Sequence, residues 1–169
     1  MIYFYGGAFN PMTVTHKEII FNLMKKMSKE DRLIIAITTH DYKKYQFPFK
    51  LREHIVIKNL LDIPITDKKV KVIEQTERTW KFLNSLTKEK ITIVLGEDEY
   101  KDLKAGLWHN STDILNTYEF IIIPRTNNIS SSIAREIINS NINNPDILHY
   151  ITETSLKILK SNDLTNNNI

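Results

Sequence analysis

The chain has 169 residues, of which 41% are apolar and 25% charged, with a formal net charge of +3 and no cysteine. This composition is typical of a globular domain with a real core, and it excludes disulfides and thiolate metal sites. The small net charge and scattered lysines argue against a nucleic-acid-binding surface, and no apolar run approaches the ~18 residues of a membrane span. We therefore expect a single domain over residues 1–161 in the cytoplasm, with a disordered polar tail at residues 162–169.

Short apolar runs and helical patterns alternate along the chain. The runs cover residues 2–5, 33–38, 70–73, 91–95 and 120–123, and several are apolar throughout, as in parallel strands that are covered on both faces. Apolar residues at helical spacing lie around residues 19–27, 51–61, 80–86, 133–138 and 147–159. This order predicts an α/β fold, a Rossmann-like open parallel sheet of about five strands with helices on both faces. Ligands of such sheets bind at the carboxyl ends of the strands.

A pair of glycines at positions 6 and 7 follows the first run directly. Glycine lets a ligand approach the backbone closely. Thr15 and Glu18 fit the capping box Thr-x-x-Glu, which predicts a helix that starts at Thr15 with His16 in its first turn. The N–H groups of a helix start favour an anion, and Thr13 would converge on the same place as His16. The structural alternative is an ordinary strand–turn–helix connection with a solvated histidine.

A second helix start lies in the stretch ISSSIAREI, which begins at Ile129. Arg135 comes four residues after Ser131 and three after Ser132, so these side chains share one helix face. Hydroxyl groups and a guanidinium at a helix N-terminus form a good phosphate site, because the arginine fork binds two phosphate oxygens at once. The structural alternative is a serine-capped helix with a solvated arginine.

These two stretches carry a resemblance to a known family. GGAFNPMTVTH, at residues 6–16, resembles the signature G-G-x-F-[DN]-P-x-[HT]-x-x-H of the adenylyl- and cytidylyltransferases. ISSSIAR, at residues 129–135, resembles their second signature I-S-S-T-x-x-R, with Ser132 in place of threonine. Thr13 stands where many members have a first histidine, and Thr15 where glycine is frequent. This variant resembles the nicotinamide/nicotinate mononucleotide adenylyltransferases of the nucleotidyltransferase superfamily, and the resemblance spans roughly residues 2–140.

Four shorter segments also resemble that family. GED at residues 96–98 resembles its G-x-D, whose acid contacts the ribose side of ATP, and DYKK at residues 41–44 resembles a loop whose lysine reaches the mononucleotide phosphate. RTWKFL resembles the start of the third helix, where a threonine or an aromatic residue faces the pyridine pocket. In LWHNSTDIL, Trp108 would stack on the pyridine ring. Their structural alternatives are a turn with a helix cap, a solvated lysine loop, a core Trp80 and a half-buried Trp108.

The resemblance implies transfer of AMP from ATP to nicotinate or nicotinamide mononucleotide, with release of pyrophosphate. It implies Mg²⁺ held mainly by the ATP phosphates, with no protein metal ligands. The implied catalytic residues are His16 and Thr13. The implied ATP-binding residues are Gly7, Ala8, Phe9, Gly96, Asp98, Ser130, Ser131 and Arg135. The implied mononucleotide-binding residues are Gly6, Asn10, Lys43, Lys44, Thr79, Trp80 and Trp108.

Two other functions stay open on the sequence. One is transfer to another phosphate acceptor, such as phosphopantetheine or glycerol phosphate. The other is a nucleotide-binding sensor without turnover, although His16 and Arg135 argue against a pure binder. We expect ATP and a pyridine mononucleotide as partners, and neither nucleic acid nor a membrane. The sequence leaves open the choice between nicotinate and nicotinamide, and also whether the chain forms a homo-oligomer.

Overall fold

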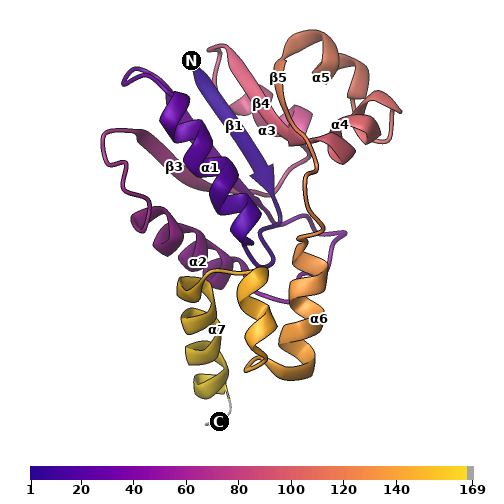
Figure 1. Ribbon diagram of the computed structural model, residues 1–169. Coiled ribbons are helices and arrows are strands. Elements are labelled where there is room, and N and C mark those ends of the chain that lie inside the picture. Colours follow the sequence, from indigo (N-terminus) through magenta and orange to yellow (C-terminus); the bar gives the residue numbers. More distant parts are fainter. Residues whose placement is uncertain (167–169) are drawn as a thin grey trace. The chain divides into compact units, whose positions relative to one another are not determined.

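The computed structural model describes residues 1–166, and the chain forms two compact units (Figure 1). The first unit comprises Met1–Ala8, Lys26–Lys44 and Asp67–Asn127. The second unit comprises Phe9–Lys25, Tyr45–Thr66 and the chain from Asn128 onward. Neither unit is a continuous stretch, and the chain first passes from one to the other between Ala8 and Phe9, inside the glycine-turn motif. The single domain that we expect over residues 1–161 stays a prediction.

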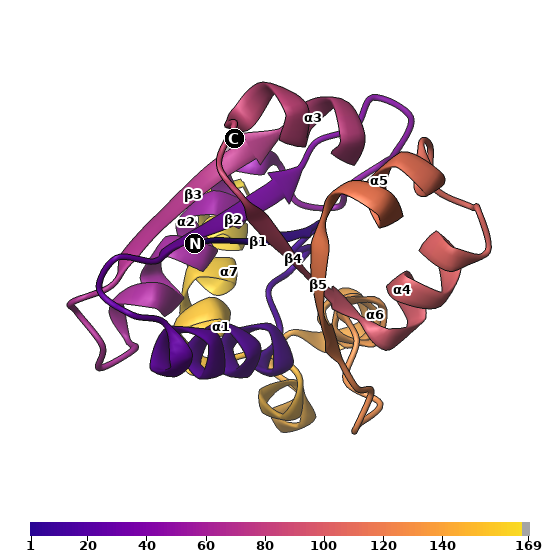
Figure 2. The ribbon, with the colours of Figure 1, turned by 90° about the horizontal axis from the view of Figure 1, so that it is seen from above.

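The first unit contains a five-stranded, wholly parallel sheet in the order β3-β2-β1-β4-β5 (Figure 2). The strands are β1 (Ile2–Gly7), β2 (Arg32–Thr38), β3 (Lys69–Gln75), β4 (Ile91–Gly96) and β5 (Glu119–Ile123). Each predicted run is a strand, so the expected α/β class and Rossmann-like parallel sheet are confirmed. Consecutive residues 33–37 of β2 are buried, which explains why this run lacks a polar–apolar alternation. The strand order reverses at β1, which lies between β2 and β4.

Three helices of the first unit share a core with the sheet. They are α3 (Thr79–Leu86), α4 (Glu97–Lys104) and α5 (Ser111–Thr117). Each contributes one fully buried side chain to this core, namely Leu83, Leu103 and Ile114. The sequence analysis predicts α3 but misses α4 and α5. Both are two turns or less, and α4 is polar apart from Leu103 and Tyr100, so neither shows a readable apolar period.

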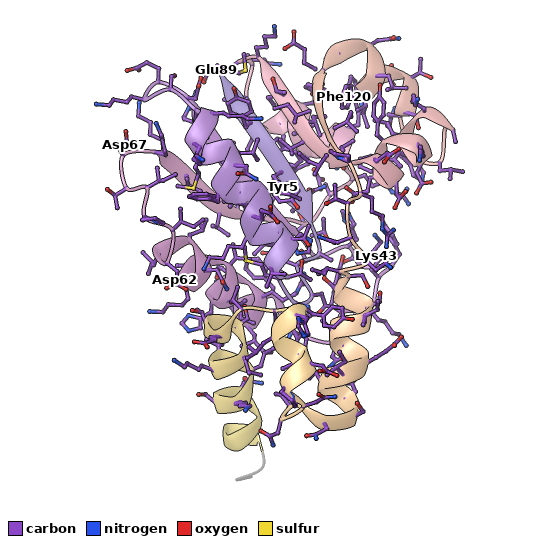
Figure 3. All side chains as sticks on the ribbon, viewed as in Figure 1. Tyr5, Lys43, Asp62, Asp67, Glu89 and Phe120 are labelled. Carbon is purple, nitrogen blue, oxygen red and sulfur yellow. The ribbon has the colours of Figure 1, made fainter. Side chains whose placement is uncertain are left out.

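Aromatic contacts reinforce this packing. The rings of Tyr100 in α4 and Phe120 in β5 have centroids 5.4 Å apart, and Phe120 is labelled in Figure 3. Trp80 of α3 meets Tyr118 edge-on, with ring centroids 6.2 Å apart. Such tilted and edge-to-face pairs stabilise a core beyond the apolar area that they bury.

The second unit is helical. Its elements are α1 (Val14–Lys26), α2 (Phe49–Leu61), α6 (Ser131–Asn141), the 3-10 helix η1 (Pro145–His149) and α7 (Glu153–Asn166). The predicted helix over residues 147–159 is wrong as one element: η1 ends at His149, and α7 begins after Thr152, whose Oγ1 accepts the N–H of Ser155. α7 continues to Asn166, so residues 162–166 are helical where we expect disorder, and residues 167–169 lie outside the described part.

A buried polar cluster joins α2 to α7. The amide of Asn59, which is fully buried, donates to Ser155 Oγ at 2.9 Å and accepts from Thr152 Oγ1 at 2.7 Å. The same amide nitrogen also donates to the Ile55 carbonyl at 2.9 Å. Because every partner in such a cluster is satisfied, it fixes the register of the two helices without leaving an orphaned group. Within residues 1–166, no helix is both long enough and apolar enough to cross a membrane.

Candidate active site

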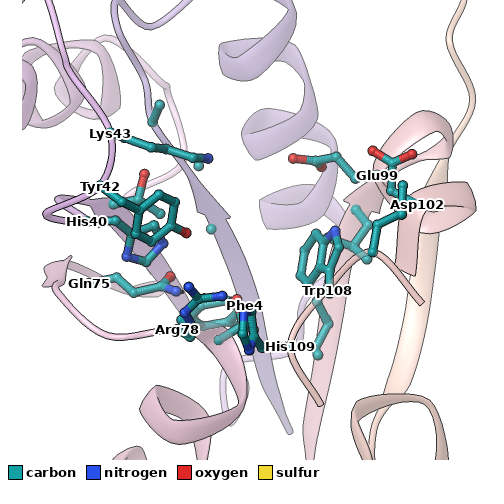
Figure 4. Close-up of a pocket in the computed structure, with 18 residues that line it drawn as sticks. Phe4, His40, Tyr42, Lys43, Gln75, Arg78, Glu99, Asp102, Trp108 and His109 are labelled. Carbon is teal, nitrogen blue, oxygen red and sulfur yellow. Dashed lines mark hydrogen bonds between the residues drawn. The ribbon is translucent and has the colours of Figure 1, made fainter. Parts of the chain in front are cut away.

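The first unit has a cavity of about 470 Å³ at the carboxyl ends of its strands (Figure 4). Its floor is formed by the ends of β1 and β4 and by Phe4, and its walls come from the loops that follow β2, β3 and α4. This is the edge of the sheet at which ligands of open α/β folds bind. The polar side chains along it are Thr38, His40, Tyr42, Lys43, Gln75, Arg78, Thr79, Glu99, Asp102 and His109.

Gly6 shapes the floor of this cavity. A Cβ atom at Gly6 would lie 3.0 Å from Phe4 Cε1 and 3.3 Å from Gln75 Oε1, tighter than ordinary van der Waals contact. Gln75 is itself held in place, because its Nε2 donates to the Glu77 carbonyl at 3.1 Å. Because it has no side chain, Gly6 leaves room for the Phe4 ring and for Gln75 at the end of β3. Its backbone lines the cavity, as we expect for a glycine that a ligand approaches closely.

Much of the predicted mononucleotide-binding set lines this cavity: Gly6, Lys43, Thr79 and Trp108 do, together with Gly7 and Ala8 from the predicted ATP-binding set. Three members of the set lie elsewhere: Asn10, which belongs to the second unit, Trp80 and Lys44. Trp80 packs against the core beside Tyr118, which is the placement that the structural alternative predicts. Lys44 is exposed and is not part of the lining.

The GED segment is the start of α4. The N–H of Gly96 donates to Glu99 Oε2 at 3.2 Å, and Asp98 forms an ion pair with Arg125 at 2.7 Å. The first contact matches the structural alternative of a turn with a helix cap, and neither Gly96 nor Asp98 lines the cavity. The ribose contact implied for Asp98 stays a prediction.

Several lining residues were missed by the sequence analysis, among them His40, Tyr42, Arg78, Glu99 and Asp102. Tyr42 and Arg78 stand inside the segments DYKK and RTWKFL, so their position after β2 and β3 was the available signal. Glu99 and Asp102 lie on α4, and no signal was available for them without that helix.

Burial shapes the charges along this cavity. Burial raises the pKa of Glu99, against the opposing effect of the Gly96 N–H hydrogen bond. Burial also lowers the pKa of His40, although its Nδ1 contacts the Thr76 carbonyl at 3.3 Å and this bond acts the other way. The positive charges of Lys43 and Arg78 lower the His40 pKa further. We therefore treat His40 as neutral at neutral pH.

The second unit holds Thr13 and His16. Thr13 directly precedes α1, and its Oγ1 accepts the N–H of His16 at 3.3 Å. Thr13 is therefore the N-cap, and the predicted start at Thr15 is wrong by one residue: Thr15 is already helical. The expected convergence of Thr13 and His16 is confirmed.

The imidazole of His16 is held in one tautomer. The backbone N–H of Thr13 donates to His16 Nδ1 at 2.9 Å, so Nδ1 is unprotonated and the proton of the neutral ring is on Nε2. The Phe9 ring packs at 5.0 Å from the imidazole, and Phe9 adopts a left-handed backbone conformation with φ of 46°. Burial lowers the pKa of His16 to about 4. At neutral pH His16 is thus an uncharged ring with a single N–H donor.

The lowered pKa of His16 predicts a pH dependence of stability. A histidine in the unfolded chain titrates near about 6.5, whereas the pKa of folded His16 is about 4. Between these values the unfolded chain binds a proton that the folded chain does not, so the free energy of unfolding falls as the pH drops through this window. We expect His16→Gln to remove about 2 kcal/mol of the loss between about pH 7 and about pH 5, in urea unfolding curves. An identical pH slope in the variant would contradict an uncharged His16 in the folded chain.

The second signature meets the first inside the second unit. Arg135 of α6 donates from Nη1 to the Asn10 carbonyl at 2.7 Å and from Nη2 to Ser132 Oγ at 3.2 Å. Ser131 Oγ donates to the Pro11 carbonyl at 2.8 Å. The start of α6 is thereby tied to the loop that leads into α1, although about 120 residues of chain separate them.

The remaining two predicted residues in this unit have structural partners. Ser130 is the N-cap of α6, because its Oγ accepts the N–H of Ile133 at 3.2 Å. Asn10 is buried, and its Oδ1 accepts the N–H of Phe47 at 3.0 Å. The buried Arg52 in turn donates from Nε to the Phe47 carbonyl at 2.9 Å. Asn10 therefore braces the loop between β2 and α2, a use of its side chain that the sequence analysis did not predict.

Comparisons with known proteins agree with this arrangement. The sequence model of the Cytidylyltransferase-like family matches residues 4–140. A probable nicotinate-nucleotide adenylyltransferase of Fusobacterium nucleatum is 26% identical over 146 residues, which cover 80% of this chain and 74% of the relative. A phosphopantetheine adenylyltransferase of Pelagibacter ubique is 28% identical, covering 92% of this chain and 94% of the relative.

The fold has matches among solved structures. The nicotinic acid mononucleotide adenylyltransferase of Plasmodium falciparum superposes with a TM-score of 0.74 at 18% identity, over 96% of each chain. At this identity the likeness concerns the fold. The match to the family model says more than the likeness of fold, because residues 4–140 include both signatures and reach every strand of the sheet. With its family model matched over most of its length, this chain belongs to the Cytidylyltransferase-like family.

Proposed function

We propose that this protein is a nucleotidyltransferase that transfers AMP from ATP to a pyridine mononucleotide, nicotinate or nicotinamide, forming the NAD-type dinucleotide and pyrophosphate. The observation that carries this proposal is the meeting of the two signatures in the second unit, where Arg135 and Ser131 are bonded to the loop of Asn10 and Pro11. The names of the relatives support the same reaction type.

The reaction needs no protein nucleophile. A phosphate oxygen of the acceptor attacks the α-phosphorus of ATP, the new P–O bond forms, and the bond to the β-phosphate oxygen breaks as pyrophosphate leaves. Catalysis then depends on positioning and on stabilisation of charge in the transition state. His16 suits this role, because its Nε2–H is a donor oriented by the Nδ1 bond to Thr13. We assign the β- and γ-phosphates to Arg135 and to the start of α6.

We assign the acceptor to the cavity of the first unit. Trp108 offers an aromatic face for the pyridine ring, and Lys43 offers a cation for the mononucleotide phosphate. Ser111 Oγ donates to the Trp108 carbonyl at 2.5 Å, which anchors the backbone of this loop at the start of α5. A stacking face on an anchored loop favours a planar acceptor over the flexible chain of phosphopantetheine.

Mg²⁺ enters this proposal with the ATP. Among residues 1–166, no group of three histidine or acidic side chains lies close enough to hold a metal ion. We propose that the ion is held mainly by the phosphate oxygens of ATP and by water. When bound, the ion would neutralise phosphate charge, while His16 would orient the α-phosphate and Arg135 the β- and γ-phosphates.

An acceptor screen tests the proposed function. Purified protein is mixed with Mg-ATP and either nicotinate mononucleotide, nicotinamide mononucleotide or phosphopantetheine, and pyrophosphate and the adenylylated product are measured. We expect product with a pyridine mononucleotide and none with phosphopantetheine. Product with phosphopantetheine alone would favour the activity of the Pelagibacter relative, and tight ATP binding without any product would favour the sensor.

A further inference from the structure

The cavity of the first unit has two cations on one wall that make no salt bridge within residues 1–166. Lys43 and Arg78 line it, and neither forms a salt bridge with any residue in the described part of the chain. Figure 4 shows both on the side of His40 and Tyr42, with Glu99 and Asp102 across the cavity beside Trp108. The two carboxylates likewise make no salt bridge within residues 1–166. The cavity thus presents separated positive and negative walls.

The guanidinium of Arg78 is held in position by an aromatic ring. It lies over the Tyr42 ring, 5.0 Å from the centroid, and that ring stacks on His40 at 5.1 Å with an interplanar angle of 10°. An arginine that stacks through its face keeps its N–H edges free for hydrogen bonds in the plane. The neighbouring Glu77 does not compete for it, because Glu77 is ion-paired with Lys81. Arg78 is therefore an oriented, charged fork at the cavity wall.

The placement of cations and carboxylates on opposite sides of the cavity fits nicotinate mononucleotide better than nicotinamide mononucleotide. The ring of nicotinamide mononucleotide is a pyridinium cation with a neutral amide. The ring of nicotinate mononucleotide carries the same cation and also a carboxylate, so it is a zwitterion. A wall with Glu99 and Asp102 suits the pyridinium of both acceptors, whereas a free guanidinium gains its strong, two-pronged hydrogen bonds only with the carboxylate.

We infer that Arg78 is a specificity-determining residue that recognises the ring carboxylate, so that the protein prefers nicotinate over nicotinamide mononucleotide. This inference rests on the proposed function. Lys43, which has a single ammonium on a flexible stem, is left for the acceptor phosphate. Arg78 is exposed, and its backbone is the N-cap of α3, with no side-chain cap bond, so its replacement leaves the fold intact.

The test compares kcat/KM for the two mononucleotides in three variants. We expect Arg78→Gln to lower kcat/KM for nicotinate mononucleotide about 10- to 100-fold and that for nicotinamide mononucleotide by less than about threefold. Arg78→Lys keeps the charge but loses the fork, so its loss should be intermediate. Lys88→Gln removes a charge from the exposed loop after α3, outside the cavity, and is the matched control, with both values unchanged.

The outcomes separate this inference from the proposed function. A wild-type preference for nicotinamide, or an equal loss for both acceptors in Arg78→Gln, would overturn the inference while the adenylyltransferase assignment stands. Absence of turnover with either pyridine mononucleotide in the wild type would overturn the proposed function and the inference together. Thermal unfolding of each variant verifies that a change in the ratio arises from the cavity.

Discussion

Replacement of His16 by alanine is expected to lower kcat about 100- to 1,000-fold while KM for ATP changes by less than about threefold. The reason is the neutral Nε2–H donor, which Thr13 orients through its bond to Nδ1. Such a donor stabilises the charge that develops on the α-phosphate more than it stabilises bound ATP, so its loss appears in kcat. Steady-state kinetics with the preferred pyridine mononucleotide measure both constants.

Two comparisons make the His16 result specific. His149→Ala removes an exposed histidine of η1 in the same unit and should leave kcat unchanged. In the wild type, a pKa of about 4 for His16 predicts no inflection in kcat near pH 6.5 from this residue. Near-normal turnover of His16→Ala would show that His16 is not a catalytic residue. If kcat of the wild type shows an inflection near that pH and kcat of the variant does not, His16 would instead transfer a proton.

The sequence analysis was strongest where a run of residues acts as one local unit. The five apolar runs became the five strands, and in β2 and β4 the run is almost wholly apolar because consecutive residues are buried. It was weaker at boundaries. Thr15 and Glu18 fit a capping box, but Thr13 caps α1, because its side chain bonds to both the His16 backbone and the His16 ring.

Hydrogen bonds between residues that lie far apart in the chain could not be predicted from local sequence patterns. Nothing in the sequence indicates that Arg135 bonds the carbonyl of Asn10, or that the Asn10 side chain holds Phe47. These are backbone contacts, and a backbone carbonyl has no residue-specific signature. The sequence analysis missed Arg78 for a related reason. Its role depends on the ring of Tyr42, which comes from the loop after a different strand. The motifs thus predicted which residues belong to each signature, while the tertiary structure shows which backbone groups hold those residues in place.

The second large effect is expected for Arg135. Arg135→Ala should raise KM for ATP about 10- to 100-fold, because the guanidinium is the assigned partner of the departing phosphates. The structure adds a second consequence. Loss of the bond to the Asn10 carbonyl leaves the hydrogen bond from Ser131 Oγ to the Pro11 carbonyl to hold the start of α6 to this loop, so the free energy of unfolding should fall by about 1.5–3 kcal/mol.

Two further variants separate binding from anchoring at Arg135. Arg135→Lys retains a positive charge but loses the fork that reaches both Asn10 and Ser132, so KM for ATP should recover in part while stability stays low. Ser132→Ala removes only the Nη2 acceptor and should change the unfolding free energy by less than about 1 kcal/mol. Urea unfolding beside ATP kinetics distinguishes these effects. An unchanged KM for ATP in Arg135→Ala, with lowered stability, would make this arginine an anchor for the signature loop and would move the phosphate assignment to the backbone at the start of α6.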